Sequence, residues 1–123
     1  MDDPCQYVLL DPYNKALPAI RSALNAAGLD IAAEWDVTYD LRQDYGVVLA
    51  PCRVLIVYNS INLLQNTVMN ATYAINGQVS IAVCEAEGHT RVSIRGHQPE
   101  LVDQALSALR QIGIRQLAPA AAA

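Results

Sequence analysis

Residues 52–60 constrain the fold more than any other segment of the chain. They read Cys-Arg-Val-Leu-Ile-Val-Tyr-Asn-Ser, an apolar run rich in β-branched side chains that ends in two residues of the type that cap helices. As a strand, this run is apolar on both sides, with Val54 and Ile56 on one face and Leu55 and Val57 on the other. Such a strand is covered on both faces or lies in the middle of a sheet. We therefore predict a central strand that leads into a helix.

The other elements are predicted from the periodicity of apolar residues and from turn residues. Residues 31–38 alternate between apolar and polar side chains, which indicates a strand near a sheet edge. Pro18 predicts a helix start, because proline is tolerated at the first helical position. Residues 39–46 are polar and predict a loop, whose carboxylates lack the spacing of a calcium-binding loop. The predicted strands are residues 5–10, 31–38, 52–58, 78–85 and 90–95, and the predicted helices are residues 18–27, 60–71 and 99–112.

This order of elements predicts an α+β fold. Its first six elements match a two-layer, ferredoxin-like split βαβ, to which a C-terminal strand and helix are added. Right-handed crossovers would place the first and third strands side by side and parallel at the centre of the sheet, with the second and fourth strands outside them. We predict one domain over residues 1–117, followed by an alanine-rich tail, residues 118–123, that is disordered.

Composition narrows the class of protein and its partners. Hydrophobic residues make up 53% of the 123 residues and charged residues only 16%, a lean polar surface that favours a homodimer. The net charge is −4 and the eight Lys and Arg are scattered, so we expect no nucleic-acid partner. No apolar run reaches the ~18 residues that a membrane span needs. The first residues lack the features of a signal peptide, which favours a cytoplasmic protein, although a mature exported form would look the same.

One candidate site lies where the predicted topology gathers the N-termini of all three helices. Helix N-termini present free N–H groups and the positive end of the helix dipole, so they favour anions. Small polar side chains, an arginine and a histidine would surround a small anionic ligand there. The alternative is that these are ordinary capping and turn residues. The candidate ligand-binding residues are Tyr58, Asn59, Ser60, Asn62, Arg95 and His97.

A second candidate site lies at the opposite end of the predicted sheet. There the topology would gather Cys5, Cys52 and Cys84, with His89 nearby. Sulfur and imidazole ligands suit zinc or iron, so a metal site is one reading of this cluster. The other reading is that three small apolar residues end strands as reduced thiols, because free cysteine is among the most buried residue types.

The sequence contains no catalytic motif that indicates a reaction. No Ser, His and Asp set has the spacing of a triad, and the chain has no glycine-rich phosphate loop. His97 alone does not argue for acid–base catalysis, since its cationic form is disfavoured just before a helix N-terminus. The residues therefore predict a non-catalytic protein.

Two segments resemble a known family. The run Val54-Leu55-Ile56-Val57-Tyr58-Asn59-Ser60, a helix, residues 79–85, a hairpin and a final helix together resemble the bacterial domain-of-unknown-function family numbered 302. In that family a strand ends in Cys-Asn-Pro, and a later strand opens with Pro-Cys and continues with alternating valines. The resemblance implies a small α+β domain that commonly self-associates and has no assigned activity.

The family's cysteines are replaced in this chain. Asn59 matches the family asparagine, but Tyr58 stands where the cysteine is expected and Ser60 where the proline is. Gln78 and Val79 stand in place of Pro-Cys. Thiol chemistry of the family's cysteines therefore does not carry over to this chain.

The sequence thus favours an accessory, non-catalytic α+β domain that binds a small, anionic ligand and forms a homodimer. One alternative is a metal- or haem-binding protein of redox or sulfur metabolism, with His89, His97 or the cysteines as ligands. A second alternative is a structural module whose apolar sheet edge mediates assembly.

Overall fold

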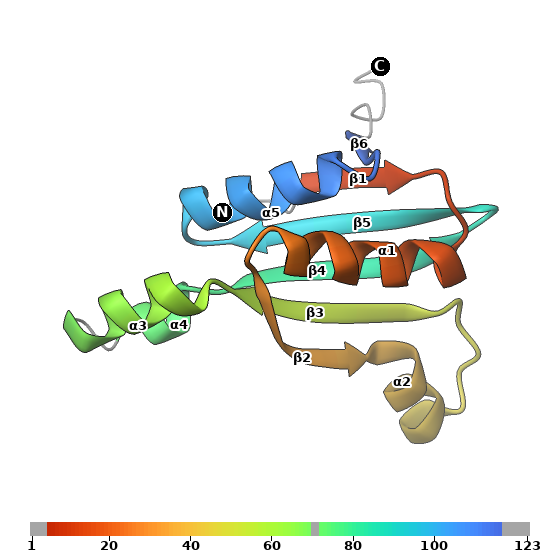
Figure 1. Ribbon diagram of the computed structural model, residues 1–123. Coiled ribbons are helices and arrows are strands. Elements are labelled where there is room, and N and C mark those ends of the chain that lie inside the picture. Colours follow the sequence, from red (N-terminus) through yellow and green to blue (C-terminus); the bar gives the residue numbers. More distant parts are fainter. Residues whose placement is uncertain (1–4, 70–71, 117–123) are drawn as a thin grey trace, which may run out of the picture.

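The computed structural model describes residues 5–69 and 72–116, which form an α+β fold with one six-stranded antiparallel sheet (Figure 1). The strand order is β2-β3-β4-β5-β1-β6. The predicted α+β class is confirmed. The strands are β1 (Cys5–Leu9), β2 (Asp30–Asp36), β3 (Cys52–Tyr58), β4 (Val79–Ala86), β5 (His89–Gly96) and β6 (Arg115–Gln116).

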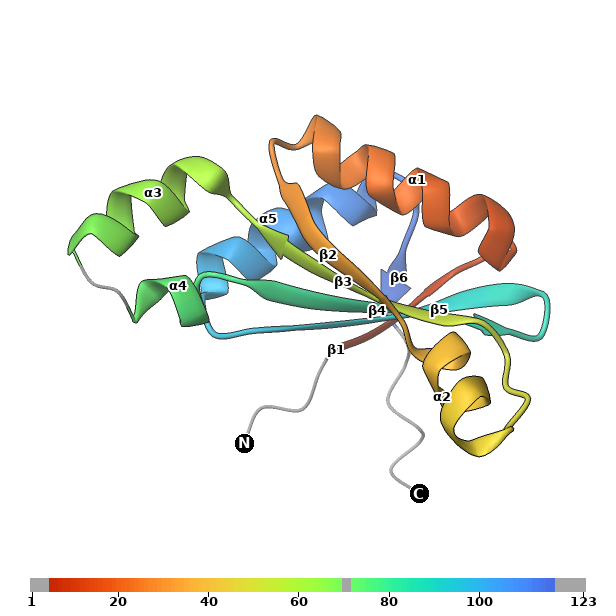
Figure 2. The same ribbon diagram turned by 90° about the horizontal axis from the view of Figure 1, so that it is seen from below.

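The two long helices α1 and α5 lie on one face of the sheet, while α2 lies on the other side at one end (Figure 2). The short helices α3 and α4 project beyond the opposite end of the sheet. No helix within the described residues is long and apolar enough to cross a membrane. The helices are α1 (Tyr13–Ala26), α2 (Val37–Tyr45), α3 (Ser60–Met69), α4 (Tyr73–Asn76) and α5 (Pro99–Arg110).

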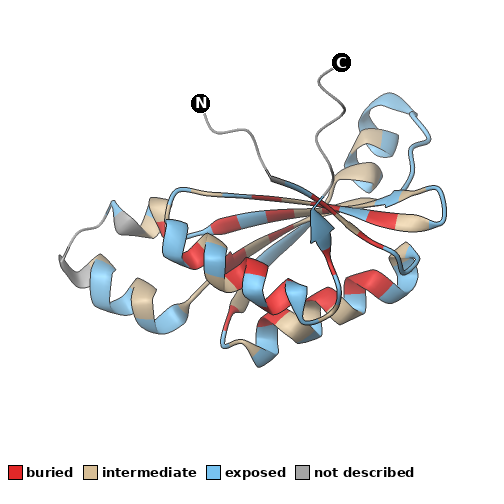
Figure 3. Ribbon diagram, turned by 90° about the horizontal axis from the view of Figure 1, so that it is seen from above, coloured by how far each residue is buried: buried red, intermediate tan, exposed pale blue. Residues whose placement is uncertain are grey.

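The hydrophobic core lies between the sheet and the helices α1 and α5 (Figure 3). We call this side of the sheet the covered face and the other side the open face. Leu55 and Val57 of β3 point into the core and are fully buried, as are Ile20 of α1 and Leu109 of α5. β3 is an interior strand, since it pairs with β2 on one side and β4 on the other, but it is second from the edge and not at the centre of the sheet as predicted.

The predicted pairing of the first and third strands is wrong. β1 pairs with β5 in an antiparallel ladder, with Tyr7 opposite Val92, and it runs opposite to β3. The reason is that α3 and α4 do not cross over the sheet, so β4 turns back directly beside β3 and the β4–β5 hairpin fills the centre. The start of α1 therefore lies at the opposite end of the sheet from the starts of α3 and α5.

One helix begins earlier than the sequence predicts, and a second replaces a predicted loop. α1 begins at Tyr13, and Pro18 lies inside it, where it has no N–H to donate to the carbonyl of Asn14. Residues 39–46 are not a loop, because most of them belong to α2. Asp36 caps this helix by accepting a hydrogen bond from Tyr39 N at 2.9 Å, and Gly46 ends it with φ 66°. The predicted helix end at Ala71 and the predicted tail fall outside the described residues.

Candidate functional site

The residues predicted to bind a ligand lie at one end of the sheet, on β3, α3 and β5. Tyr58 ends β3 and Arg95 and His97 lie at the end of β5, with β4 between these strands. Two strand spacings separate the two groups by about 10 Å. Arg95 and His97 are exposed. Ligand binding at this end stays a prediction.

The backbone at this end already has local partners. Asn59, not Ser60, caps α3, since its Oδ1 accepts hydrogen bonds from Ile61 N at 3.1 Å and Asn62 N at 3.2 Å. The Asn59 side chain also donates to Gln104 of α5 at 3.4 Å. At the start of α5, Pro99 has no N–H, and Glu100 places a carboxylate in the first turn. Both helix starts are therefore poorly suited to an anion.

A cavity of about 380 Å³ lies at the other end of the sheet, between the start of α1, α2 and β3. Its lining includes one arginine each from α2 and β3 and two tyrosines, and Leu49 and Pro51 add apolar surface. Its volume is in the range of small-ligand pockets. The residues that line it are Tyr13, Asp36, Thr38, Tyr39, Arg42, Leu49, Pro51 and Arg53.

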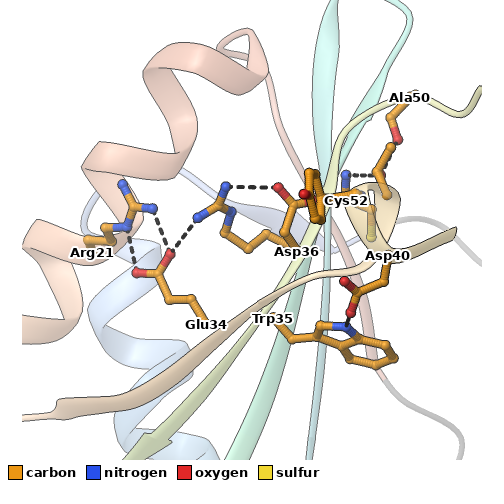
Figure 4. A network of polar contacts seen from close by, with 10 residues as sticks. Arg21, Glu34, Trp35, Asp36, Asp40, Ala50 and Cys52 are labelled. Carbon is orange, nitrogen blue, oxygen red and sulfur yellow. Dashed lines mark hydrogen bonds and ion pairs between the residues drawn. The ribbon is translucent and has the colours of Figure 1, made fainter. Parts of the chain in front are cut away.

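A chain of ion pairs holds Arg53 in the wall of this cavity (Figure 4). Arg53 donates to Glu34 at 3.3 Å and to Asp36 at 3.2 Å, across the β2–β3 ladder. Glu34 also accepts two hydrogen bonds from Arg21 of α1, at 2.6 and 2.8 Å, in a bidentate pair. The network therefore joins α1 to the edge strand β2.

The same contacts shift the ionisation of its members. The hydrogen bond from Arg21 lowers the pKa of Glu34, and burial of the carboxyl opposes this only in part. The hydrogen bond to Glu34 raises the pKa of Arg21. Burial lowers the pKa of Arg53, but its interactions with Glu34, Tyr13 and Asp36 outweigh burial and the pKa is raised. These shifts favour the charged forms of Arg21, Glu34 and Arg53 at neutral pH.

Arg42 differs from Arg53 because no described residue forms a side-chain hydrogen bond or ion pair with it. It lies exposed on α2 at the rim of the cavity. The Nε of Arg53 is buried and has no hydrogen-bond partner in the described part of the chain. The charged groups of the lining are two guanidinium groups and the Asp36 carboxylate, so the cavity presents a net positive charge beside aromatic and apolar surface.

The sequence did not point to this cavity, because Arg42 fell in the predicted loop and Arg53 in a buried strand. A capping signal was present, however. Asp36 stands three residues before Tyr39, and Gly46 follows at the distance of a C-terminal cap, a pattern that indicates a helix over residues 37–45.

The cysteines do not gather as predicted. Cys52 and Cys84 lie opposite each other on β3 and β4 and form a disulfide, so the expectation of reduced thiols is wrong for this pair. Cys5 lies opposite Ile94, whereas Cys84 lies opposite Arg91, further along β5. The reason is the reversed direction of β1. Among the described residues, no group of three or more His, Cys, Asp and Glu side chains is arranged to hold a metal ion.

Thr38 links the disulfide to the cavity. Its hydroxyl accepts a hydrogen bond from Cys52 N at 2.9 Å and donates one to Ala50 O at 2.9 Å. Glu85 N bonds Pro51 O at 2.8 Å next to it. These contacts fix the segment that enters β3 against α2, so the wall of the cavity is preformed.

Comparison with known families agrees with the resemblance seen in the sequence. Residues 6–118 match the family described as "Domain of unknown function DUF302". The chain belongs to the DUF302 family. No curated protein matches it.

A solved structure shares the DUF302 fold. It is described as "Crystal structure of uncharacterized conserved protein DUF302 from Bacillus stearothermophilus", and it superposes with a TM-score of 0.64. The match covers 89% of this chain and 91% of that protein, at 16% sequence identity. At this identity the similarity establishes the shared fold.

Proposed function

We propose that this DUF302 domain binds a small monoanionic ligand in the cavity between α1, α2 and β3, in an accessory role without catalysis. The observation that carries the proposal is the unpaired Arg42 guanidinium at the rim of a cavity that is otherwise built from aromatic, apolar and internally paired side chains. An arginine fork is suited to a carboxylate or phosphate oxygen pair. The anionic ligand expected from the sequence is thus assigned to the opposite end of the sheet.

The neighbouring groups limit the charge and shape of the ligand. Asp36 and Glu34 already neutralise much of the charge of Arg53 and Arg21, so only one guanidinium remains free to pair with an anion. A dianion would meet the Asp36 carboxylate as well. Tyr13 and Tyr39 offer aromatic surface to an apolar or planar ligand body. The cavity therefore favours a single negative charge attached to a flat or apolar group.

Calorimetric titration with model compounds tests this function. We expect benzoate to bind the native chain and to bind more tightly than neutral benzamide or dianionic phenyl phosphate. Replacing Arg42 by alanine should weaken benzoate binding about tenfold, the loss typical of a charged hydrogen-bond pair. Arg42→Lys should keep part of the affinity.

The matched control is Arg91→Ala, since Arg91 is also an exposed arginine but lies on strand β5, outside the cavity. This variant should bind benzoate as the native chain does. No binding by the native chain would contradict the proposal, and so would equal losses in the Arg42 and Arg91 variants.

A further inference from the structure

The disulfide between Cys52 and Cys84 lies at one end of the open face, outside the hydrophobic core. Val83 of β4 is fully buried in the core, so its neighbour Cys84 points to the open face. Both cysteines are partly exposed, and neither lines the ligand cavity. A thiol in solution can therefore approach the disulfide while the core stays closed.

The two strands that the disulfide joins do not depend on it for their pairing. β3 and β4 form six residue pairs, and the disulfide joins the two residues of the first pair. The remaining pairs continue along the sheet to Val57 and Val79, which are both fully buried. Reduction of the disulfide therefore breaks one covalent bond at the end of a ladder whose hydrogen bonds and core contacts remain.

An arginine lies next to one of the two sulfur atoms. Arg91 of β5 is directly opposite Cys84, and residues in such positions have Cβ atoms about 5 Å apart, so the Arg91 side chain can reach the Cys84 sulfur. Arg91 is exposed, and no described residue forms a side-chain hydrogen bond or ion pair with it. On its other side it faces Val8 of β1. Its positive charge is therefore available to the cysteine.

This charge makes the two cysteines unequal. A nearby cation favours the thiolate form of a cysteine, and a stabilised thiolate is the better leaving group when a disulfide is attacked. Arg91 supplies such a charge to Cys84. The arginine that follows Cys52 in the chain, Arg53, is on the covered face, where two carboxylates pair with it. Attack at Cys52, with Cys84 as the leaving group, is therefore favoured.

We propose that the Cys52–Cys84 disulfide is a redox-active site that exchanges two electrons with a dithiol. One thiolate of the dithiol attacks Cys52 Sγ and forms a mixed disulfide, while the bond between the two protein sulfurs breaks and its electron pair leaves on Cys84 as a thiolate beside Arg91. The second thiolate of the dithiol then attacks its own sulfur in the mixed disulfide and releases Cys52. The dithiol is oxidised to a disulfide, and the two cysteines take up two electrons and the two protons that the dithiol loses.

The rate of reduction by dithiothreitol under native conditions tests the role of Arg91. All chains carry Cys5→Ser, which leaves only the two cysteines of the disulfide. Arg91→Gln should slow reduction about fivefold, because the leaving thiolate loses its neighbouring positive charge, and Arg91→Lys should keep most of the native rate. The matched control is Arg95→Gln, on the same strand and face but opposite Ser80, and it should be reduced as fast as the native chain.

Trapping of the mixed disulfide identifies the attacked sulfur. Brief treatment with glutathione, followed by acid quenching and mass spectrometry of peptides, should find glutathione on Cys52 and a free thiol on Cys84. Circular dichroism of the reduced chain should match that of the oxidised chain, since a reversible site needs a folded reduced form. The proposal is overturned if the reduced chain unfolds or if the disulfide is reduced only in denaturant. Equal rates for the Arg91 and Arg95 variants, or glutathione found mainly on Cys84, also overturn it.

Discussion

The covered and open faces of β3 carry similar side chains in different surroundings. Leu55 and Val57 are fully buried in the core, whereas Val54 and Ile56 on the open face are only partly buried. The side chains on both faces are aliphatic, so their chemistry does not tell which face the folded monomer covers. The comparison shows that a strand can carry aliphatic side chains on both faces although only one face is fully buried in the core.

The largest expected effect is on the covered face. Leu55→Ala should lower the free energy of unfolding by about 4 kcal/mol, because it leaves a cavity in a core that is closed around a fully buried side chain. Ile56→Ala on the open face should cost less than about 1 kcal/mol at protein concentrations too low for association. Urea unfolding of both variants measures the difference, and equal losses would show that the two faces are equally buried in the monomer.

A smaller effect is expected from the disulfide, which lies on the open face. Replacing Cys52 and Cys84 together by serine should lower the free energy of unfolding by about 3.7 kcal/mol, the value expected for a link between residues 32 apart in the chain. The native chain in excess reductant should show the same loss. If reductant leaves the free energy of unfolding unchanged, the disulfide does not stabilise the folded chain.

The smallest effect is expected from the ion pairs at the edge of the covered face. Glu34→Gln should cost about 1 kcal/mol at neutral pH, as expected for a half-exposed bidentate pair. The pKa of Glu34 is lowered in the folded chain, so its contribution is fully present above the ordinary value of 4.5 and is lost as the pH falls through the folded-state pKa.

Thermal unfolding of the native chain and the Gln variant across acid pH measures this contribution. Their difference should be constant at neutral pH and disappear in acid. A difference that persists unchanged to low pH would show that the Glu34 carboxylate acts through packing and not through its charge.

The sequence predicts the strands of this fold well and their arrangement less well. Alternation and turn residues locate β2 to β5 to within a residue or two, because side-chain periodicity is a local property. Strand order is not local. The position of β1 depends on whether residues 60–76 cross the sheet or project from its end, and no residue in that segment determines this alone.

For the candidate site, too, the sequence predicts local features but not the contacts between distant segments. Capping side chains can be recognised from the sequence, which offers Asn59 and Ser60 for α3, and the structure shows that Asn59 is the cap. The cavity needs side chains from α1, α2 and β3, and its polar lining comes from residues that look like ordinary surface or strand residues. Arg42 becomes a candidate only because the folded chain leaves its guanidinium without a described partner.

The position of β1 has a consequence for how the chain folds during synthesis. The strand lies between β5 and β6, which are the last two strands of the chain, and Thr90 of β5 bonds Asp11 O just after β1 across a sequence separation of 79 residues. β1 leaves the ribosome first but has no partner strand until β5 is complete. The middle of the sheet, from β2 to β5, can assemble before β1 joins it. Contacts between distant segments slow folding, so we expect docking of β1 to be a late step.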